Sequence, residues 1–205
     1  MTEGSDAVLT LCEHDVPEVV DILCESFFDY PVMQFVVGRD EKDYEVRLRK
    51  LIHFFVMARV LRGEVLLGIG DPNGLGGAAL VSRPTEAEAP PELSKLSENV
   101  WSELGASARA RYEAFGAACA PFEVETPHIH LNMIGVRREA QGTGLGRRLI
   151  EHVHLSSRQD SMSEGVTLTT EVEANVPLYR HFGYEIVGHT TVAPELRTWG
   201  FFRAD

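Results

Sequence analysis

The sequence predicts a mixed α/β fold, with helices flanking a central, mixed but mostly antiparallel, twisted sheet. The 205 residues are 44% hydrophobic and 24% charged, which is ordinary for a globular protein with one substantial core. Stretches with the 3.6-residue period of a helix alternate with short strand-like runs. Most neighbouring strands have short connections, which favours antiparallel pairing, but one strand–helix–strand unit over 128–172 requires a parallel pair. We expect a single domain over residues 1–205.

The first half of the chain is predicted to hold two helices followed by a hairpin. Asp15 and Glu18 have the spacing of a capping box, and apolar residues recur at helical intervals after them, so a helix is expected over 15–28. It stops before Pro31, because a proline disfavours the helical conformation of the preceding residue. A second amphipathic helix is expected over 41–61. The hairpin is expected from strands over 64–69 and 75–82, with turn-forming residues 70–74 between them.

The second half is predicted to add two helices and then to alternate strands with helices. Residues 83–92 are rich in proline and glutamate and are expected to form a surface connection. The elements predicted beyond it are helices over 93–104 and 108–119, a strand over 128–136, a helix from 145, a strand over 165–172, a short helix over 176–182, and hairpin strands over 184–192 and 196–204.

Composition excludes several classes of function. The formal net charge is −12 at pH 7, so the chain lacks the basic surface that an extended nucleic-acid interface requires. Three cysteines lie far apart without CxxC spacing, which indicates neither a disulfide framework nor a cysteine zinc site. The first residues show no signal-peptide pattern, and no run of about 18 apolar residues occurs. We therefore expect a cytoplasmic protein without a nucleic-acid or membrane partner.

The stretch IGVRREAQGTGLGRRLIEHV, residues 134–153, carries the main functional signal. It reads as the end of a strand, a glycine-rich loop with four arginines nearby, and the start of a helix. Free backbone N–H groups and the positive end of the helix dipole make such a loop an anion site. The loop lacks the lysine and hydroxyl of a Walker P-loop and the GxGxxG spacing of a dinucleotide site. ATP hydrolysis and a nucleotide-dependent oxidoreductase are therefore disfavoured.

Gln141, Gly144 and Gly146 have a different spacing: a glutamine, two residues, a glycine, one residue and a glycine. This pattern resembles the pyrophosphate loop of the GNAT superfamily of acetyl-CoA-dependent N-acetyltransferases, and the order of elements is similar to that superfamily. Within it, the chain most resembles the puromycin N-acetyltransferase-like members. The matching pieces are VPEVV, FFDYP, IGVRREAQGTGLG, NVPLYRHFGY and LRTW. The resemblance implies the GNAT fold, acetyl-CoA as cofactor and a small-molecule amine as acceptor.

The resemblance also assigns residues to the cofactor. In the family, backbone groups of the strand before the loop hold the pantetheine arm and the loop holds the pyrophosphate. The residues implied here are Met133, Ile134, Val136, Gln141, Gly142, Thr143, Gly144, Leu145, Gly146, Arg147, Asn175 and Tyr179. Asn175 comes just before a predicted helix, so an N-cap is an alternative role for its side chain.

Acetyl transfer to an amine requires an unprotonated nucleophile and a proton for the departing thiolate. Tyr179 matches the general acid of the family, and a phenol with an ordinary pKa near 10 is protonated at neutral pH; the alternative is a ring packed in the core. Puromycin-type enzymes carry a glutamate base where this chain has Thr169. Glu171 lies about 6.6 Å further along the same strand face. It is the candidate catalytic base, and a solvated carboxylate is the alternative.

The acceptor amine is expected near the segment FFDYP, where similar proteins form their acceptor cleft. Asp29 and Tyr30 are the candidate substrate-binding residues, with Asp29 able to pair with a cationic amine. His128 and His130 are spaced to share a strand face, as two metal ligands do, but no third ligand is spaced to join them. We expect these histidines to be structural and the site to hold no metal.

Two function classes stay open at the level of sequence. The first is an acetyl-CoA-dependent N-acetyltransferase that acts on a primary amine of a small molecule by direct attack on the thioester, with antibiotic resistance as one implied role. The second is a non-catalytic acyl-CoA-binding or regulatory module, which the displaced glutamate favours. The sequence allows a monomer or a homodimer, for which the closing hairpin offers an edge strand.

Overall fold

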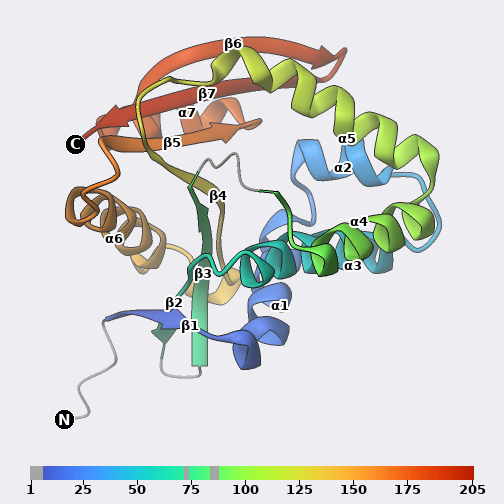
Figure 1. The fold of residues 1–205 in the computed structure, drawn as a ribbon, viewed down its shortest axis with the longest axis horizontal. Coiled ribbons are helices and arrows are strands. Elements are labelled where there is room, and N and C mark those ends of the chain that lie inside the picture. Colours follow the sequence, from blue (N-terminus) through green and yellow to red (C-terminus); the bar gives the residue numbers. More distant parts are fainter. Residues whose placement is uncertain (1–6, 72–73, 84–87) are drawn as a thin grey trace.

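One seven-stranded sheet runs through the computed structural model, which describes residues 7–71, 74–83 and 88–205. The strand order is β1-β2-β3-β4-β5-β7-β6 (Figure 1). β4 and β5 pair in parallel, and the other five neighbouring pairs are antiparallel, which confirms the predicted mixed sheet. The strands are β1 (Val8–Leu11), β2 (Leu66–Asp71), β3 (Gly74–Ser82), β4 (Ile129–Val136), β5 (Gly165–Thr170), β6 (Glu185–Ala193) and β7 (Leu196–Ala204).

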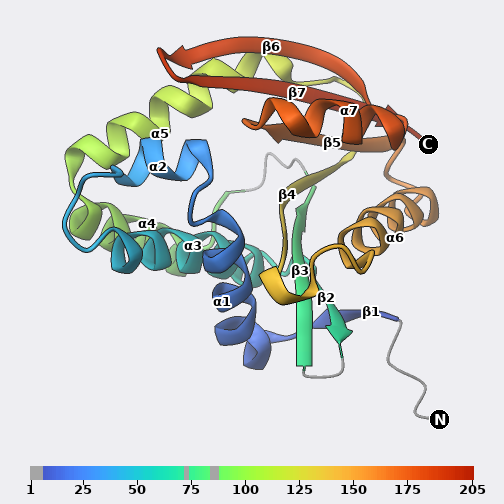
Figure 2. The same cartoon turned by 180° about the vertical axis from the view of Figure 1, so that it is seen from behind.

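Helices cover both faces of this sheet, because each face presents a separate apolar cluster. Helices α1 to α5 pack on one cluster, and α6 and α7 pack on the other (Figures 1 and 2). Every helix in the described part of the chain is too short or too polar to span a bilayer. The helices are α1 (Val16–Phe27), α2 (Pro31–Val37), α3 (Tyr44–Leu61), α4 (Pro91–Leu104), α5 (Ala106–Cys119), α6 (Leu145–Gln159) and α7 (Val176–His181).

The predicted capping box at the start of α1 does not form. The Asp15 carboxylate accepts a bond from the Cys12 N–H at 2.8 Å, and the Glu18 carboxylate accepts one from the Leu75 N–H at 3.1 Å. Both side chains therefore bind groups outside the first turn of the helix. The predicted turn over 70–74 and connection over 83–92 include residues 72–73 and 84–87, which lie outside the described residues.

Pro31 begins a helix that the sequence pattern did not reveal. The prediction that α1 ends before it is correct, but Pro31 then occupies the first turn of α2. A proline fits there because the first N–H groups of a helix have no intrahelical acceptor. The segment FFDYP is therefore a bend between two helices, and it brings Tyr30 back toward the sheet.

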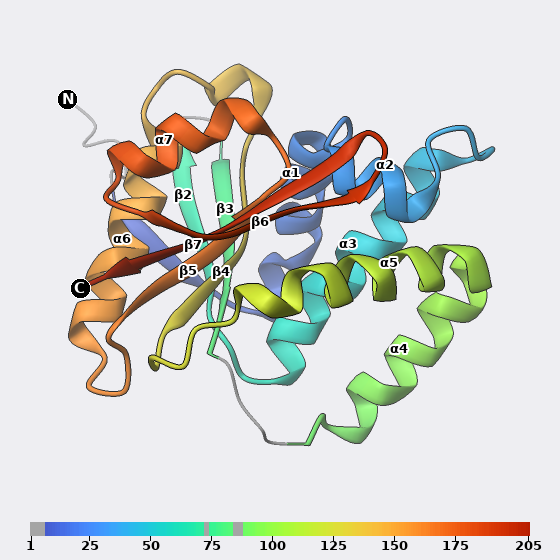
Figure 3. The same ribbon diagram turned by 90° about the horizontal axis from the view of Figure 1, so that it is seen from above.

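The hairpin β6–β7 is fixed to α5 by one aromatic side chain. Phe122, just after α5, sits on the two hairpin glycines, so closely that a Cβ on Gly188 would lie 1.9 Å from its ring. A Cβ on Gly200 would lie 2.7 Å from the Phe122 side chain. Only glycine at these positions admits the ring. The C-terminal end of α5 therefore lies close to the hairpin (Figure 3).

The feature that opens the site is the short pairing of β4 with β5. Their parallel register covers only Ile129–Leu131 against Val166–Leu168, although both strands continue. On its other edge, β4 shifts register against β3 so that Asn132 is an extra residue, which forms a bulge. Beyond this bulge the two parallel strands separate, and their main-chain groups no longer pair with each other.

Candidate active site

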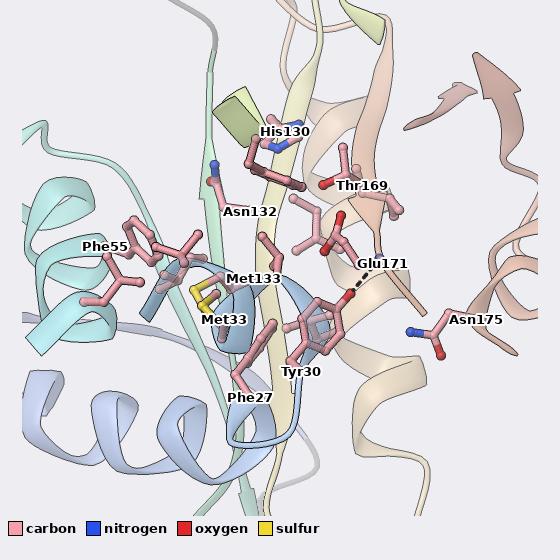
Figure 4. A pocket seen from close by; sticks show the side chains of 18 of the residues that line it. Phe27, Tyr30, Met33, Phe55, His130, Asn132, Met133, Thr169, Glu171 and Asn175 are labelled. Carbon is pink, nitrogen blue, oxygen red and sulfur yellow. Dashed lines mark hydrogen bonds between the residues drawn. The ribbon is translucent and has the colours of Figure 1, made fainter. Parts of the chain in front are cut away.

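A cavity of about 320 Å³ lies at the point where β4 and β5 separate. Its walls come from the α1–α2 bend, α3, α5, β4, β5 and α7, so segments far apart in the sequence meet there (Figure 4). Apolar and aromatic side chains form most of the lining. The polar and ionisable lining residues are Tyr30, Arg59, Tyr112, His130, Asn132, Thr169, Glu171, Asn175 and Tyr179.

Glu171 is a buried carboxylate at the edge of this cavity. It follows the last residue of β5, and only 8% of it is exposed. The Thr198 hydroxyl, on β7, donates to Glu171 Oε1 at 2.8 Å. Burial raises the pKa of Glu171 to about 7, while hydrogen bonds from Thr198 and Tyr30 oppose that rise. A carboxyl group with this pKa exchanges its proton near neutral pH.

Tyr30 ties the helical side of the cavity to the end of β5. Its hydroxyl lies 3.0 Å from Thr170 Oγ1 and accepts a bond from the Glu171 N–H at 3.3 Å. Burial raises the pKa of Tyr30 far above its ordinary value, so the phenol stays protonated. Asp29, the other predicted substrate residue, does not line the cavity; its side chain is 72% exposed and lies 3.9 Å from Arg138.

Tyr179 lines the same cavity from α7 and is 7% exposed. Its ring centroid lies 5.6 Å from that of Phe201 and 5.9 Å from that of Tyr184. Burial, and then the nearby carboxyl of Glu171, raises the pKa of Tyr179 to about 12. The ring is thus packed in the core, which was the predicted alternative to a catalytic role, yet Tyr179 also borders the cavity that Glu171 lines.

Asn175 lies beyond Glu171 at the outer end of the cavity (Figure 4). Its side chain does not cap α7. Instead, Asn175 Nδ2 donates to Thr170 Oγ1 at 3.2 Å, the same hydroxyl that contacts Tyr30. The short network through Thr170 therefore fixes the outer mouth of the cavity.

The glycine loop presents main-chain N–H groups to its surroundings. Gly142 and Gly144 have φ angles of 78° and 90°, which favour glycine, and a Cβ on either would meet nothing within 4 Å. Gly144 is the N-cap of α6, and no side chain caps that end. Thr143 turns inward and donates to the Ala140 carbonyl at 2.6 Å. Buried Leu145 anchors the helix beneath the loop.

The main chain of β4 divides between β3 and the gap. The Arg137 N–H donates to the Gly76 carbonyl of β3 at 2.8 Å. Because the main-chain groups of every second residue in a strand point to the same side, the N–H and C=O groups of Met133 also point toward β3. The main-chain groups of Ile134 and Val136 point to the opposite side, toward the gap between β4 and β5. The Val136 carbonyl accordingly accepts a bond from Ser26 Oγ at 3.2 Å and one from Gln141 Nε2 at 3.4 Å.

The two histidines near β4 have protein partners. His128 Nδ1 lies 2.7 Å from the Thr126 carbonyl oxygen, and His130 Nδ1 lies 2.9 Å from the Thr167 hydroxyl. Burial lowers the pKa of His130 to about 4, so its ring is neutral. In the described residues, no cluster of three or more histidine, cysteine or acidic side chains could hold a metal ion.

Comparison with known proteins identifies the architecture. Residues 99–186 match the family model described as an acetyltransferase (GNAT) domain. Within this range the chain is similar to a GNAT acetyltransferase domain. Its described sheet and helices correspond to the GNAT fold, as the sequence predicted. These comparisons do not confirm membership of the puromycin-type subgroup, which stays a prediction.

Solved GNAT structures share the fold along almost the whole chain. A Corynebacterium glutamicum protein solved as histone acetyltransferase HPA2 and related acetyltransferase is 22% identical, with a TM-score of 0.67 over 98% of this chain and 96% of its own. The Drosophila melanogaster polyamine N-acetyltransferase is 13% identical, with a TM-score of 0.63 over 97% and 99%. A mosquito arylalkylamine N-acetyltransferase-like protein is 13% identical, with a TM-score of 0.62 over 97% and 99%. At these identities the likeness concerns the fold.

A curated relative is closer in sequence but matches a shorter stretch. The 5-NmdU N-acetyltransferase of Pseudomonas phage PaMx11 is 35% identical over 78 residues, which are 38% of this chain. The match spans 54% of that relative, so the chain covers about half of the relative's length.

The sequence did not reveal several residues that complete this cavity. Thr198, the donor to Glu171, lies on a strand 27 residues away, and nothing local marks it. Arg59 interrupts the apolar face of α3 one turn after Phe55, which was a readable signal. Asn132 gave no such signal, because polar and apolar residues alternate without a break from His128 to Met133, and the bulge shows only in the register against β3.

Proposed function

We propose that this chain is an acetyl-CoA-dependent N-acetyltransferase that transfers an acetyl group to a primary amine of a small molecule, by direct attack on the thioester. The observation that carries the proposal is that Glu171 and Tyr179 border one cavity beside the gap between β4 and β5. One can take a proton near neutral pH, and the other holds its proton to about pH 12. The N-acetyltransferase names of the relatives support the same reaction class.

Acetyl-CoA suits the groups that surround the gap. The N–H groups of Leu145, Gly146 and Arg147, at the uncapped start of α6, would hold the pyrophosphate, and Gly142 and Gly144 leave room for it. Main-chain groups of Ile134 and Val136, together with the Asn175 amide, would hold the pantetheine arm. When bound, acetyl-CoA supplies an acyl group activated as a thioester.

Glu171 prepares the acceptor. A free alkylamine is mostly protonated at neutral pH and is then no nucleophile. The Glu171 carboxylate attracts the ammonium group and takes a proton from it, directly or through one water, while Thr198 holds Oε1 in place. None of the groups that shift the pKa of Glu171 is a cation, so an acceptor ammonium has no competing counter-ion there.

Tyr179 serves the leaving group. Its phenol keeps its proton throughout the neutral range, so it can donate a hydrogen bond to the sulfur, and then the proton, as the C–S bond breaks, although its pKa lies above that of a free thiol. The apolar walls of the cavity limit access of water, which favours the amine over hydrolysis.

Thiol release from acetyl-CoA, followed over a panel of primary amines, tests the proposal. Puromycin belongs in the panel because of the matching sequence pieces. We expect Tyr179→Phe and Glu171→Gln each to lower kcat/KM by about 100-fold or more. Tyr44→Phe is the matched control, since the Tyr44 hydroxyl donates to the Phe28 carbonyl and Tyr44 does not line the cavity.

Calorimetric titration with CoA separates catalysis from binding. We expect Tyr179→Phe to bind CoA with nearly unchanged affinity. If CoA binds but no amine releases thiol above background, the chain is the non-catalytic acyl-CoA-binding module. If CoA does not bind, the GNAT loop has no cofactor role in this chain, and both functions are rejected.

A further inference from the structure

The two ends of the cavity carry opposite charges. Glu171 lies at the end near Asn175, where the cofactor groups gather. Arg59 lines the cavity from α3, one turn beyond Phe55, which Figure 4 shows on the far side of the cavity from Asn175. Among the described lining residues, these are the two side chains that carry charge near neutral pH, Glu171 once it gives up its proton at about pH 7, because His130 is neutral.

The charge of Arg59 is directed at the cavity even though it has a partner. Arg59 Nη1 lies 2.9 Å from Glu64 Oε2, and both side chains are mostly buried. Glu64 lies in the turn after α3 and is not part of the cavity wall. The guanidinium is thus closer to the cavity than the carboxylate is. Its field reaches His130, whose pKa is lowered by burial first, then by His128 and then by Arg59.

The wall between the two charges is apolar and aromatic. Phe55 comes from α3, Tyr112 and Phe115 come from α5, and the rings of Phe55 and Tyr112 lie 5.9 Å apart. Met33 and Met133 complete the middle of the cavity. The part of a substrate that packs against this wall gives up its contacts with water, and that desolvation costs least when this part has few polar groups.

We propose that Arg59 restricts the acceptor to monoamines: a primary amine with an apolar or aromatic body and no second cationic group. This inference rests on the proposed N-acetyltransferase function. The reacting ammonium lies against Glu171, and the body extends along the aromatic wall. A second ammonium at the far end of the body meets the Arg59 guanidinium in a poorly hydrated place, and repulsion between like charges opposes its binding.

Matched pairs of amines test the proposal directly. Hexylamine is compared with 1,6-diaminohexane, and 4-methylbenzylamine with 1,4-bis(aminomethyl)benzene, because each pair differs in one terminal ammonium. We expect kcat/KM of the wild type to favour each monoamine by at least about 10-fold. Equal use of both members by the wild type overturns the proposal.

Variants at Arg59 assign the preference to this residue. In Arg59→Met the preference falls to about 2-fold or less, because the repelling charge is gone, and in Arg59→Lys it is retained. Glu64→Gln removes the partial neutralisation and raises the preference above that of the wild type. An unchanged preference in Arg59→Met overturns the role of Arg59, and Glu64→Gln provides the same test if Arg59→Met does not fold.

The same assay separates this inference from the function on which it rests. If no amine in either pair or in the wider panel releases thiol, the N-acetyltransferase proposal itself fails. If panel amines react but neither monoamine does, the selectivity proposal fails. If the monoamines react and the diamines react equally well, only the selectivity proposal fails.

Discussion

Glu171 combines burial with a well-placed donor on β7, the Thr198 hydroxyl, and a weaker effect from Tyr30. The cavity wall removes water from its carboxyl group, which raises its pKa, while the Thr198 hydroxyl stabilises the ionised form. The other titratable groups that face it are Tyr30, Tyr179 and Cys119, and burial raises the pKa of each. They stay neutral near pH 7, so a change in ionisation there belongs to Glu171.

Replacing Thr198 tests how the pKa of Glu171 is set. In Thr198→Val the carboxylate loses its donor at 2.8 Å, so its pKa rises above about 7. We expect the acid limb of the kcat/KM profile to move to higher pH by roughly one unit. Thr198→Ser keeps the hydroxyl and should restore the wild-type limb. A lower rate with an unmoved limb would mean that Thr198 acts only through packing.

At the scale of helices and strands, two features of the backbone form the proposed cofactor site: the loop before α6 and the gap between β4 and β5. A helix start without a side-chain cap leaves N–H groups for a ligand, and a bulge at Asn132 ends the pairing of two parallel strands. Neither device depends on the chemistry of one side chain. Both depend on the backbone conformation, which the two positive-φ glycines permit in the loop.

Gly144→Ala tests the loop. An L-residue at φ 90° is strained, so the N–H groups at the start of α6 move or the loop refolds. We expect the dissociation constant for CoA to rise at least about 10-fold, measured by calorimetry, with a folding cost of about 1–2 kcal/mol.

Gly105→Ala is the matched control for that measurement. Gly105 is also a helix N-cap with a positive φ, at 85°, and a Cβ there would also meet nothing within 4 Å. Its substitution should cost comparable stability and leave CoA binding unchanged. Equal weakening of CoA binding by both variants would show that the loss comes from stability and not from the loop.

At the scale of the whole molecule, the buried carboxyl group of the site lowers the free energy of unfolding. Two apolar clusters hold the sheet and its helices together, and the buried carboxyl of Glu171 opposes them once it ionises. Its pKa is about 7 in the folded chain against an ordinary 4.5, so the unfolded chain ionises first. Stability from this group is therefore full below about pH 4.5 and falls as pH rises toward 7.

Glu171→Gln removes this dependence. We expect its free energy of unfolding to exceed that of the wild type by on the order of 2 kcal/mol at pH 8, and by much less at pH 5. Urea unfolding at both pH values measures the difference. A variant that is less stable than the wild type at pH 8 would contradict the raised pKa.

Much of the architecture was predictable from local pattern. The helices α3 to α6, the hairpins and the parallel pair follow from apolar periodicity and from the lengths of the connections. Two features near the start of the chain were not predicted correctly. The capping box was wrong because its carboxylates find partners in other segments, and α2 was missed because Pro31 can end one helix and begin the next.

The sequence by itself predicted most of the order of elements and the glycine loop, because periodicity and spacing are properties of neighbouring residues, and the family resemblance supplied the candidate pair Tyr179 and Glu171. Only the tertiary structure decided that Glu171 is buried and bonded to Thr198, that Tyr30 lines the cavity while Asp29 does not, and that Arg59 lines the same cavity. Burial and charge placement depend on which distant segments pack together. Those contacts set the pKa values and the shape on which the proposed chemistry depends.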